Sequence, residues 1–188
     1  MRNFLTFVFE VVKVVVISLA IIIPVRYFLI QPFYVKGASM EPNFHDHEYL
    51  IIDEISYRFR EPERGEIIVF KYPRDPSQYF IKRIIGMPGE KIEIKEGEIY
   101  IYTKDSNRRI KLDEDYLLEG VSTLSSKDGI IEILSDEYYL LGDNRNHSKD
   151  SRSFGTVKES FVVGRVLFRG WPFDKLGTFE VPEYSLIN

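Results

Sequence analysis

KIEIKEGEIYIY, residues 91–102, is the stretch of sequence that predicts the fold most directly. Apolar and polar residues alternate through 91–95 and again through 98–102, as they do in strands that bury one face. Glu96 and Gly97 separate the two runs, which is the spacing of a two-residue hairpin turn. The stretch therefore predicts two antiparallel strands with one face against a core.

Short runs of this kind continue on both sides of that hairpin. Further strands are predicted over residues 33–36, 49–52, 65–72, 79–85, 130–134, 137–141 and 161–169. Turn residues separate the runs, and helical periodicity is scarce beyond residue 31. Gly164 interrupts the last run and predicts a bulge or bend. We therefore expect a mainly β fold of bent antiparallel sheets, with a mobile polar insert at 103–128.

The N-terminal segment has a different composition. Residues 4–30 are mostly Val, Ile, Leu and Phe, with Glu10, Lys13 and Arg26 as the only charged residues. The apolar run between Lys13 and Arg26 is shorter than the roughly 20 residues that cross a bilayer. Both side chains can nevertheless extend their charges toward the lipid headgroups. We expect a retained transmembrane anchor over 1–31 and one β-domain over 32–188.

A cleaved secretory signal and a buried core helix are the alternatives for this segment. No small-x-small cleavage site follows the apolar run, which disfavours a cleaved signal. Arg2 and Lys13 precede the uncharged run and Arg26 and Lys36 follow it, so charge does not predict the orientation in the membrane.

Composition excludes several classes of function. A chain of 188 residues is long enough for one domain with an anchor. Its net charge of -4 supplies no basic face for a phosphate backbone, so we expect no nucleic-acid partner. The sequence has no cysteine, which excludes thiol catalysis and cysteine metal clusters.

The three histidines are candidates for a metal ligand or a catalytic base. His45 and His47 flank Asp46 and would share one face of a strand, but no third ligand is evident, so a solvated turn is the favoured interpretation. His147 lies in a polar loop and could assist a serine, although no G-x-S-x-G elbow is present.

Ser39 and Lys82 are the candidates for a nucleophile and its base. Ser39 lies in GASMEPNF, residues 37–44, where a serine can equally be a turn former. Lys82 and Arg83 are adjacent on a predicted strand, so one of these two cations must face an apolar layer. Burial lowers the pKa of a lysine, and a neutral amine can accept the proton of a serine hydroxyl. The alternative is an edge lysine with its ammonium in water.

Four segments in this order resemble the sequence boxes of bacterial type I signal peptidases, which are Ser/Lys serine proteases. They are GASMEP at 37–42, GEIIVF at 65–70, IKRIIGMPG at 81–89 and GDNRNHSKDSRSFG at 142–155. The resemblance extends from the anchor to about Phe173. It implies the signal-peptidase β-fold and a membrane-bound endopeptidase that cleaves N-terminal signal peptides from secreted precursors.

The resemblance also implies roles for individual residues. Ser39 matches the nucleophile, Lys82 the general base, and Ser148 the residue that orients the lysine nitrogen. Residues that support the site are Asp143, Asn144, Arg145, Asp150, Arg83 and Arg152. Residues expected to contact substrate, in pockets that accept small side chains, are Phe33, Val35, Phe80, Ile81 and Met40.

The chain departs from the family pattern in three places. Gly37 stands where many relatives carry a hydroxyl donor to the oxyanion. Stabilisation of the oxyanion would then rest on backbone N–H groups, chiefly that of Ser39 and secondarily that of Gly37. Asn43 stands where threonine is common. Residues 86–141 leave no room for the large second β-domain of some relatives.

The resemblance implies no metal and no organic cofactor. Its expected partners are signal-peptide-bearing precursors and membrane lipid, and the chain is expected to be a monomer. We expect a single-pass protein of the plasma membrane with its catalytic domain on the extracytoplasmic face. A self-cleaving soluble Ser/Lys protease is one alternative, but it would need a DNA-binding domain and a cleavable linker. An inert membrane-anchored β module is the other, disfavoured because Ser39, Lys82, Ser148 and Asp150 are all present.

Overall fold

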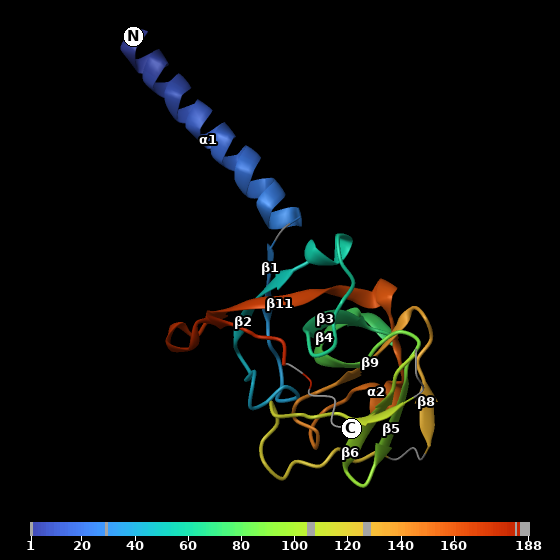
Figure 1. Cartoon of the computed structure of the whole chain (residues 1–188). Helices are drawn as coiled ribbons and strands as arrows, with labels where there is room; N and C mark the ends of the chain where they lie inside the picture. The colour runs from blue at the N-terminus through green and yellow to red at the C-terminus, as the bar shows by residue number, and fades with distance from the viewer. Residues whose placement is uncertain (1, 29, 105–107, 126–128, 183, 185–188) are drawn as a thin grey trace.

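An N-terminal helix projects away from a body of β-sheet (Figure 1). The structure is a computed structural model that describes residues 2–28, 30–104, 108–125, 129–182 and 184. Helix α1, Arg2–Phe28, contains a 20-residue section, Phe4–Ile23, of which none is buried against the rest of the chain. A helix of that length spans about 30 Å, which is the thickness of the bilayer's hydrocarbon core. Helix α1 is therefore long and apolar enough to cross a membrane, and it is not a core helix.

Strands from both halves of the chain form the larger of two antiparallel sheets. Its strands, in spatial order, are β1 (Ile30–Tyr34), β2 (Tyr49–Asp53), β11 (Val162–Trp171), β3 (Ile67–Tyr72), β4 (Asp75–Gly86), β9 (Glu137–Leu141) and β10 (Val157–Lys158), with β12 (Gly177–Thr178) beside β11. Short helices connect them: η1 (Ser56–Arg58), α2 (Ser151–Phe154), η2 (Glu159–Phe161) and η3 (Phe173–Lys175). The prediction of a mainly β fold with antiparallel sheets is confirmed.

The hairpin predicted at 91–102 forms the centre of the smaller sheet. Its strand order is β7 (Arg109–Lys111), β6 (Glu98–Tyr102), β5 (Lys91–Lys95) and β8 (Ile130–Glu132). The register runs from Lys91 opposite Tyr102 to Lys95 opposite Glu98. Glu96 and Gly97 have φ angles of 55° and 85°, the positive values that a tight type I′ turn requires. The alternation buries Ile92, Ile99 and Ile101 completely or nearly so.

The strands bend where the sequence places glycine. The pairing of β11 with β3 shifts register between Val162 and Gly164, as the predicted bulge requires. A Cβ atom at Gly164 would lie 2.4 Å from the carbonyl oxygen of Asp53, so only glycine allows β11 to approach β2 this closely. The bulge therefore curves the sheet around the apolar core that includes Val35, Leu50 and Ile52.

The segment expected to be a mobile insert, 103–128, is attached to the body at a few of its described residues. Strand β7 extends the smaller sheet, and Leu112 and Thr123 are buried. Because the segment is mostly polar, its composition did not indicate that a few of its residues pack against the body. Its central part lies beside the 142–150 segment, because Glu114 and Thr123 both form hydrogen bonds with Arg145.

Candidate active site

Ser39 lies in a turn that directly follows β1. Gly37 has a φ of 95°, a left-handed value that glycine adopts without strain. On the other side of the serine, the Met40 side chain is only 1% exposed and belongs to the core. The backbone N–H of Asn144 donates to the Ser39 carbonyl at 3.1 Å, and the Asn144 side chain donates to the Ala38 carbonyl at 3.0 Å. Ser39 is thus held between the core and the 142–150 segment.

Lys82 reaches the nucleophile candidate from strand β4. Its Nζ atom is 2.7 Å from Ser39 Oγ and 2.6 Å from the Ile81 carbonyl oxygen. The residue is 3% exposed, and Nζ lies 5.5 Å from the centroid of the Phe80 ring. The structure therefore brings together the two residues that the sequence singled out.

Burial changes the chemistry of this amine. It lowers the pKa of Lys82 to about 8, although the negative charges of Asp150 and Asp143 act in the opposite direction. At pH 7.4 roughly a fifth of such amines are neutral, compared with about one in a thousand at the ordinary value. In the neutral form, Nζ can accept a hydrogen bond from the Ser39 hydroxyl across the same 2.7 Å. The pair can then act as nucleophile and base.

Ser148 lies at the same junction. A Cβ atom built on Gly142 would be 2.1 Å from Ser148 Oγ and 2.5 Å from the Ser39 carbonyl oxygen, so the two serine segments converge on this glycine. Ser148 Oγ is buried and has no hydrogen-bond partner among the described residues. The expected bond to the lysine nitrogen is therefore not formed in this structure. The hydroxyl keeps an unused donor and two acceptor sites beside the dyad.

Arg83 and Asp143 form a buried ion pair behind the dyad. The guanidinium donates from Nε and Nη2 to the two carboxylate oxygens at 2.9 and 2.7 Å, and the side chains are 4% and 0% exposed. The sequence predicted that one of Lys82 and Arg83 would face an apolar layer, but both are buried. Alternation places them on opposite faces of β4, and Asp143 neutralises the one that stays charged.

A second ion pair closes the other end of the 142–150 segment. Arg152 donates from Nε and Nη2 to the two oxygens of Asp150 at 2.9 and 2.8 Å. Asp150 also accepts from the backbone N–H of Gly142 at 3.1 Å and is itself fully buried. These residues were expected at the surface or bracing the site, and the structure places them at the base of the segment.

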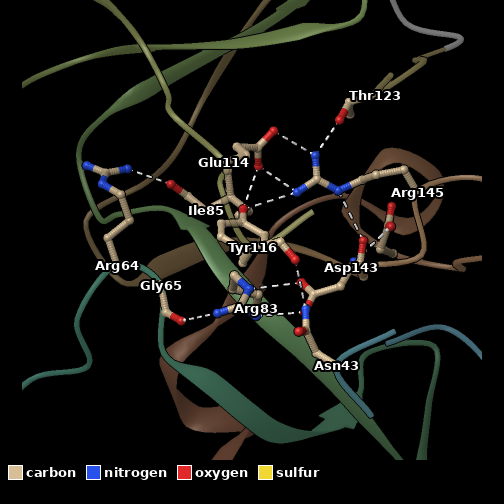
Figure 2. Close-up of polar contacts among 12 residues, drawn as sticks. Asn43, Arg64, Gly65, Arg83, Ile85, Glu114, Tyr116, Thr123, Asp143 and Arg145 are labelled. Carbon is tan, nitrogen blue, oxygen red and sulfur yellow. Dashed lines mark hydrogen bonds and ion pairs between the residues drawn. The ribbon is translucent and has the colours of Figure 1, made fainter. Parts of the chain in front are cut away.

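The sequence analysis assigned no role in the site to three residues of this region, Asn43, Glu114 and Tyr116. Asn43 donates to Asp143 Oδ2 at 2.8 Å and to the Tyr116 carbonyl at 3.1 Å, and Glu114 pairs with Arg145 (Figure 2). Asn43 and Asp143 are 100 positions apart, and Asn43 and Tyr116 are 73 apart. No local sequence pattern indicates such contacts. The one available signal was Asn43 itself, which stands where threonine is common in the family.

A cleft of about 690 Å³ opens beside Ser39 and Lys82. Four of the expected substrate-contacting residues line it: Phe33, Val35, Phe80 and Ile81. Met40 does not line the cleft, because its side chain turns into the core instead. The expectation of a substrate contact for Met40 is corrected accordingly.

Of the two backbone N–H groups expected to bind an oxyanion, one already has an acceptor and the other has none among the described residues. The N–H of Gly37 donates to Asp46 Oδ1 at 2.9 Å, so this donor is already occupied. The N–H of Ser39 has no hydrogen-bond acceptor within the described ranges of the chain. We therefore correct the expectation for Gly37, whose role is conformational here, and retain the N–H of Ser39 as the available donor.

No histidine forms a hydrogen bond or ion pair with Ser39 or Lys82 among the described residues. His147 is exposed at the cleft, with Nδ1 3.3 Å from Asn144 Oδ1. His45 and His47 approach Glu48 and Asp46 at 3.5 and 3.1 Å. Within the residues that the structure describes, no group of three or more His, Asp or Glu side chains is arranged to hold a metal ion.

Comparison with known proteins gives matches over most of the chain. The family model described as signal peptidase, peptidase S26, matches residues 8–171. A probable signal peptidase I-2 from Synechocystis sp. is 37% identical over 174 residues, covering 89% of this chain and 75% of that protein. A signal peptidase IB from Staphylococcus aureus is 33% identical over 172 residues, covering 86% and 88%. The crystal structure of a signal peptidase I from Enterococcus faecalis V583 has 32% sequence identity and a TM-score of 0.46, covering 57% of this chain and 97% of that one.

Proposed function

Because the chain belongs to the signal peptidase family, peptidase S26, it is a membrane serine endopeptidase that cleaves signal peptides, and we propose that Ser39 and Lys82 perform the cleavage. The observation that carries this assignment is a nearly inaccessible amine 2.7 Å from a serine hydroxyl. Neither the self-cleaving soluble protease nor the inert module is favoured, because the curated relatives are named signal peptidases I.

The reaction begins with the neutral form of Lys82. Its nitrogen takes the proton of Ser39 as Oγ attacks the scissile carbonyl carbon, and the N–H of Ser39 donates to the developing oxyanion. The resulting ammonium returns its proton to the leaving amine when the peptide bond breaks. Water then attacks the acyl-enzyme with Lys82 again as base, and Ser39 is regenerated. Asp150 and Arg152 fix the 142–150 segment beside the amine, and the hydroxyl of Ser148, which is unpaired among the described residues, can turn to orient the nitrogen during the reaction.

An extended substrate fits between two free strand edges. Within the described chain, β1 pairs only with β2, and residues 79–82 of β4 pair only with β3. Both segments line the cleft, so a substrate strand can form backbone hydrogen bonds with either edge. Side chains that alternate along that strand would enter the pockets near Phe33 and Ile81. These shallow pockets select small residues at the first and third positions before the cut.

The apolar helix α1 supports a proposed membrane arrangement. Section Phe4–Ile23 crosses the plasma membrane once, and the β-domain, residues 32–188, lies on the extracytoplasmic face where signal peptides emerge. Lipid contacts this helix along its unburied length. The chain acts as a monomer without nucleic acid, metal or organic cofactor.

Cleavage of a signal-bearing precursor tests the assignment. The full chain in detergent micelles should cut the precursor once, whereas Ser39→Ala and Lys82→Ala should be inactive while remaining folded. A chelator should leave the wild-type rate unchanged. If both alanine variants cut at the wild-type rate, the dyad assignment is wrong.

A further inference from the structure

We infer that Glu114, from the segment predicted to be a loose insert, is a positioning residue for the catalytic dyad. Together with Arg145, Arg83 and Asp143, which are buried, the partly buried Glu114 forms a group of four charges, termed here the buried charge cluster (Figure 2). The inference rests on the proposed function, because it concerns the same Ser39 and Lys82.

Glu114 supplies the anion for Arg145. The guanidinium donates from Nη1 and Nη2 to the two Glu114 oxygens at 2.9 and 2.6 Å. The Arg145 side chain is 0% exposed and that of Glu114 is 12% exposed, so the guanidinium itself has no contact with bulk solvent. Arg145 also donates to the hydroxyl of Thr123, which is buried as well. A bidentate pair of this kind fixes the orientation of the guanidinium plane.

Arg145 in turn holds the 142–150 segment at two points. Its Nε donates to the Gly142 carbonyl at 3.1 Å, and its own carbonyl accepts from Arg152 Nη2 at 2.7 Å. Gly142 is the residue on which Ser39 and Ser148 converge, and Arg152 is the partner of Asp150. The Glu114–Arg145 pair therefore fixes the backbone that surrounds the dyad.

Tyr116 joins this pair to the ion pair behind Lys82. Its hydroxyl donates to Glu114 Oε1 at 2.5 Å, and its ring centroid lies 4.0 Å from Cζ of Arg83. In Figure 2 the tyrosine lies between Arg83 and the Glu114–Arg145 pair. Burial, and next the charge of Glu114, raises the pKa of Tyr116 well above its ordinary value, so the phenol stays protonated as a donor.

The cluster is balanced in charge, with two arginines and two carboxylates. Removing the Glu114 charge leaves Arg145 buried without an anion, a situation that strongly disfavours the native arrangement. The four residues of the cluster are absent from the lining of the cleft, so substrate binding should be little affected. A displacement of about 1 Å at reacting groups can cost about 10²-fold in rate. The loss should therefore appear in kcat.

The test compares Glu114→Gln with a matched control in the full chain. The control is Glu98→Gln, whose partner Lys111 is exposed on the neighbouring strand β7. We expect Glu114→Gln to lower kcat by roughly 10-fold to 100-fold with KM within about twofold. The control should match wild type. Wild-type kcat in Glu114→Gln, or a loss explained entirely by the unfolded fraction in circular dichroism, would overturn the inference.

Two further readouts separate positioning from simple stability. The pH profile of kcat/KM in Glu114→Gln should shift to lower pH, because an uncompensated positive charge disfavours the Lys82 ammonium. The loss of kcat in the double variant Glu114→Gln/Arg145→Met should be smaller than the product of the two single losses, since both changes break the same pair. An unshifted profile, or fully additive losses, contradicts the inference. Cleavage by Ser39→Ala in the same assay would instead contradict the proposed function.

Discussion

At the scale of single residues, the account depends on how β4 distributes two adjacent cations. Because side chains alternate along β4, Lys82 points toward the cleft and Arg83 toward the interior, and only Arg83 meets a carboxylate there. Arg83 keeps its charge because Asp143 meets it in a bidentate pair. Lys82 has no carboxylate within ion-pair distance among the described residues, and its hydrogen bonds go to a hydroxyl and a carbonyl. One cation is thus structural and the other is available as a base.

The pH dependence of cleavage follows from that difference. The neutral amine is the active form, so kcat/KM should fall as pH drops below the pKa of Lys82, about 8, and reach a plateau above it. Initial rates on a precursor between pH 5 and 10 measure this directly. A profile governed instead by a group near 6.5, the reference pKa of histidine, would point to His147 and against the lysine.

Stability should respond to the same amine and, like the cleavage rate, should rise with pH. The pKa of Lys82 is lowered from 10.5 to about 8 on folding, so burial of the ammonium disfavours the folded state fully below about pH 8. This penalty disappears as the pH rises toward 10.5. The inactive variant Lys82→Met should therefore gain stability over wild type at pH 6, by about 2 kcal/mol more than at pH 10. Urea unfolding of both full chains at the two pH values measures the difference, and equal gains would contradict it.

The sequence predicted the dyad and some of the residues around it, but it gave no role to Asn43, Glu114 or Tyr116. Strand alternation pointed to a buried cation at 82 or 83, and the resemblance of the four boxes assigned Ser39 as its partner. The roles of Asn43, Glu114 and Tyr116 depend on contacts between segments far apart in the chain. Such contacts arise only when the sheets are assembled, so period and composition cannot indicate them.

At the scale of elements, locally determined features were predicted best. The 91–102 hairpin has its turn residues and its buried face encoded within twelve positions, and it formed in the expected register. For the insert at 103–128, the sequence did not indicate the ion pair between residues 31 positions apart that attaches it to the 142–150 segment. Gly37 was likewise predicted as an oxyanion donor, whereas the carboxylate of Asp46 occupies its N–H.

Gly142, directly after β9, offers a test of how closely two catalytic elements approach. A Cβ atom there would lie 2.1 Å from Ser148 Oγ and 2.5 Å from the Ser39 carbonyl oxygen, and backbone must move to relieve the second contact. We expect Gly142→Ala to lower kcat by about 10²-fold or more. Gly177→Ala is the control, since nothing lies within 4 Å of its Cβ position. Equal rates for the two variants would show that the close approach has no catalytic importance.

At the scale of the whole molecule, we assign membrane anchoring to helix α1 and catalysis to the β-sheet body. Helix α1 is unburied in Phe4–Ile23, while three apolar clusters stabilise the sheets. The apolar run between Lys13 and Arg26 seemed short for a span from composition alone. The continuous helix Arg2–Phe28 supplies the length, because residues on both sides of those charges are also helical.

Deletion of residues 1–28 tests this division. The full chain should remain in membranes washed with alkaline carbonate, whereas the shortened chain should be released. The shortened chain should still cleave a soluble peptide substrate in a Ser39-dependent manner, because α1 contributes no residue to the cleft. Release of the full chain by the carbonate wash would contradict the assignment of α1 as a membrane anchor.

The titration of the Lys82 amine itself tests the central claim most directly. Lysine side chains labelled with ¹⁵N in the full chain, with Lys82→Met used to assign the signal, can be followed by NMR from pH 6 to 12. The structure predicts that the Lys82 signal titrates near 8, below the ordinary value of 10.5 for a lysine. A Lys82 signal that titrates with the exposed lysines, near about 10.4, would contradict the proposal that this amine is the general base.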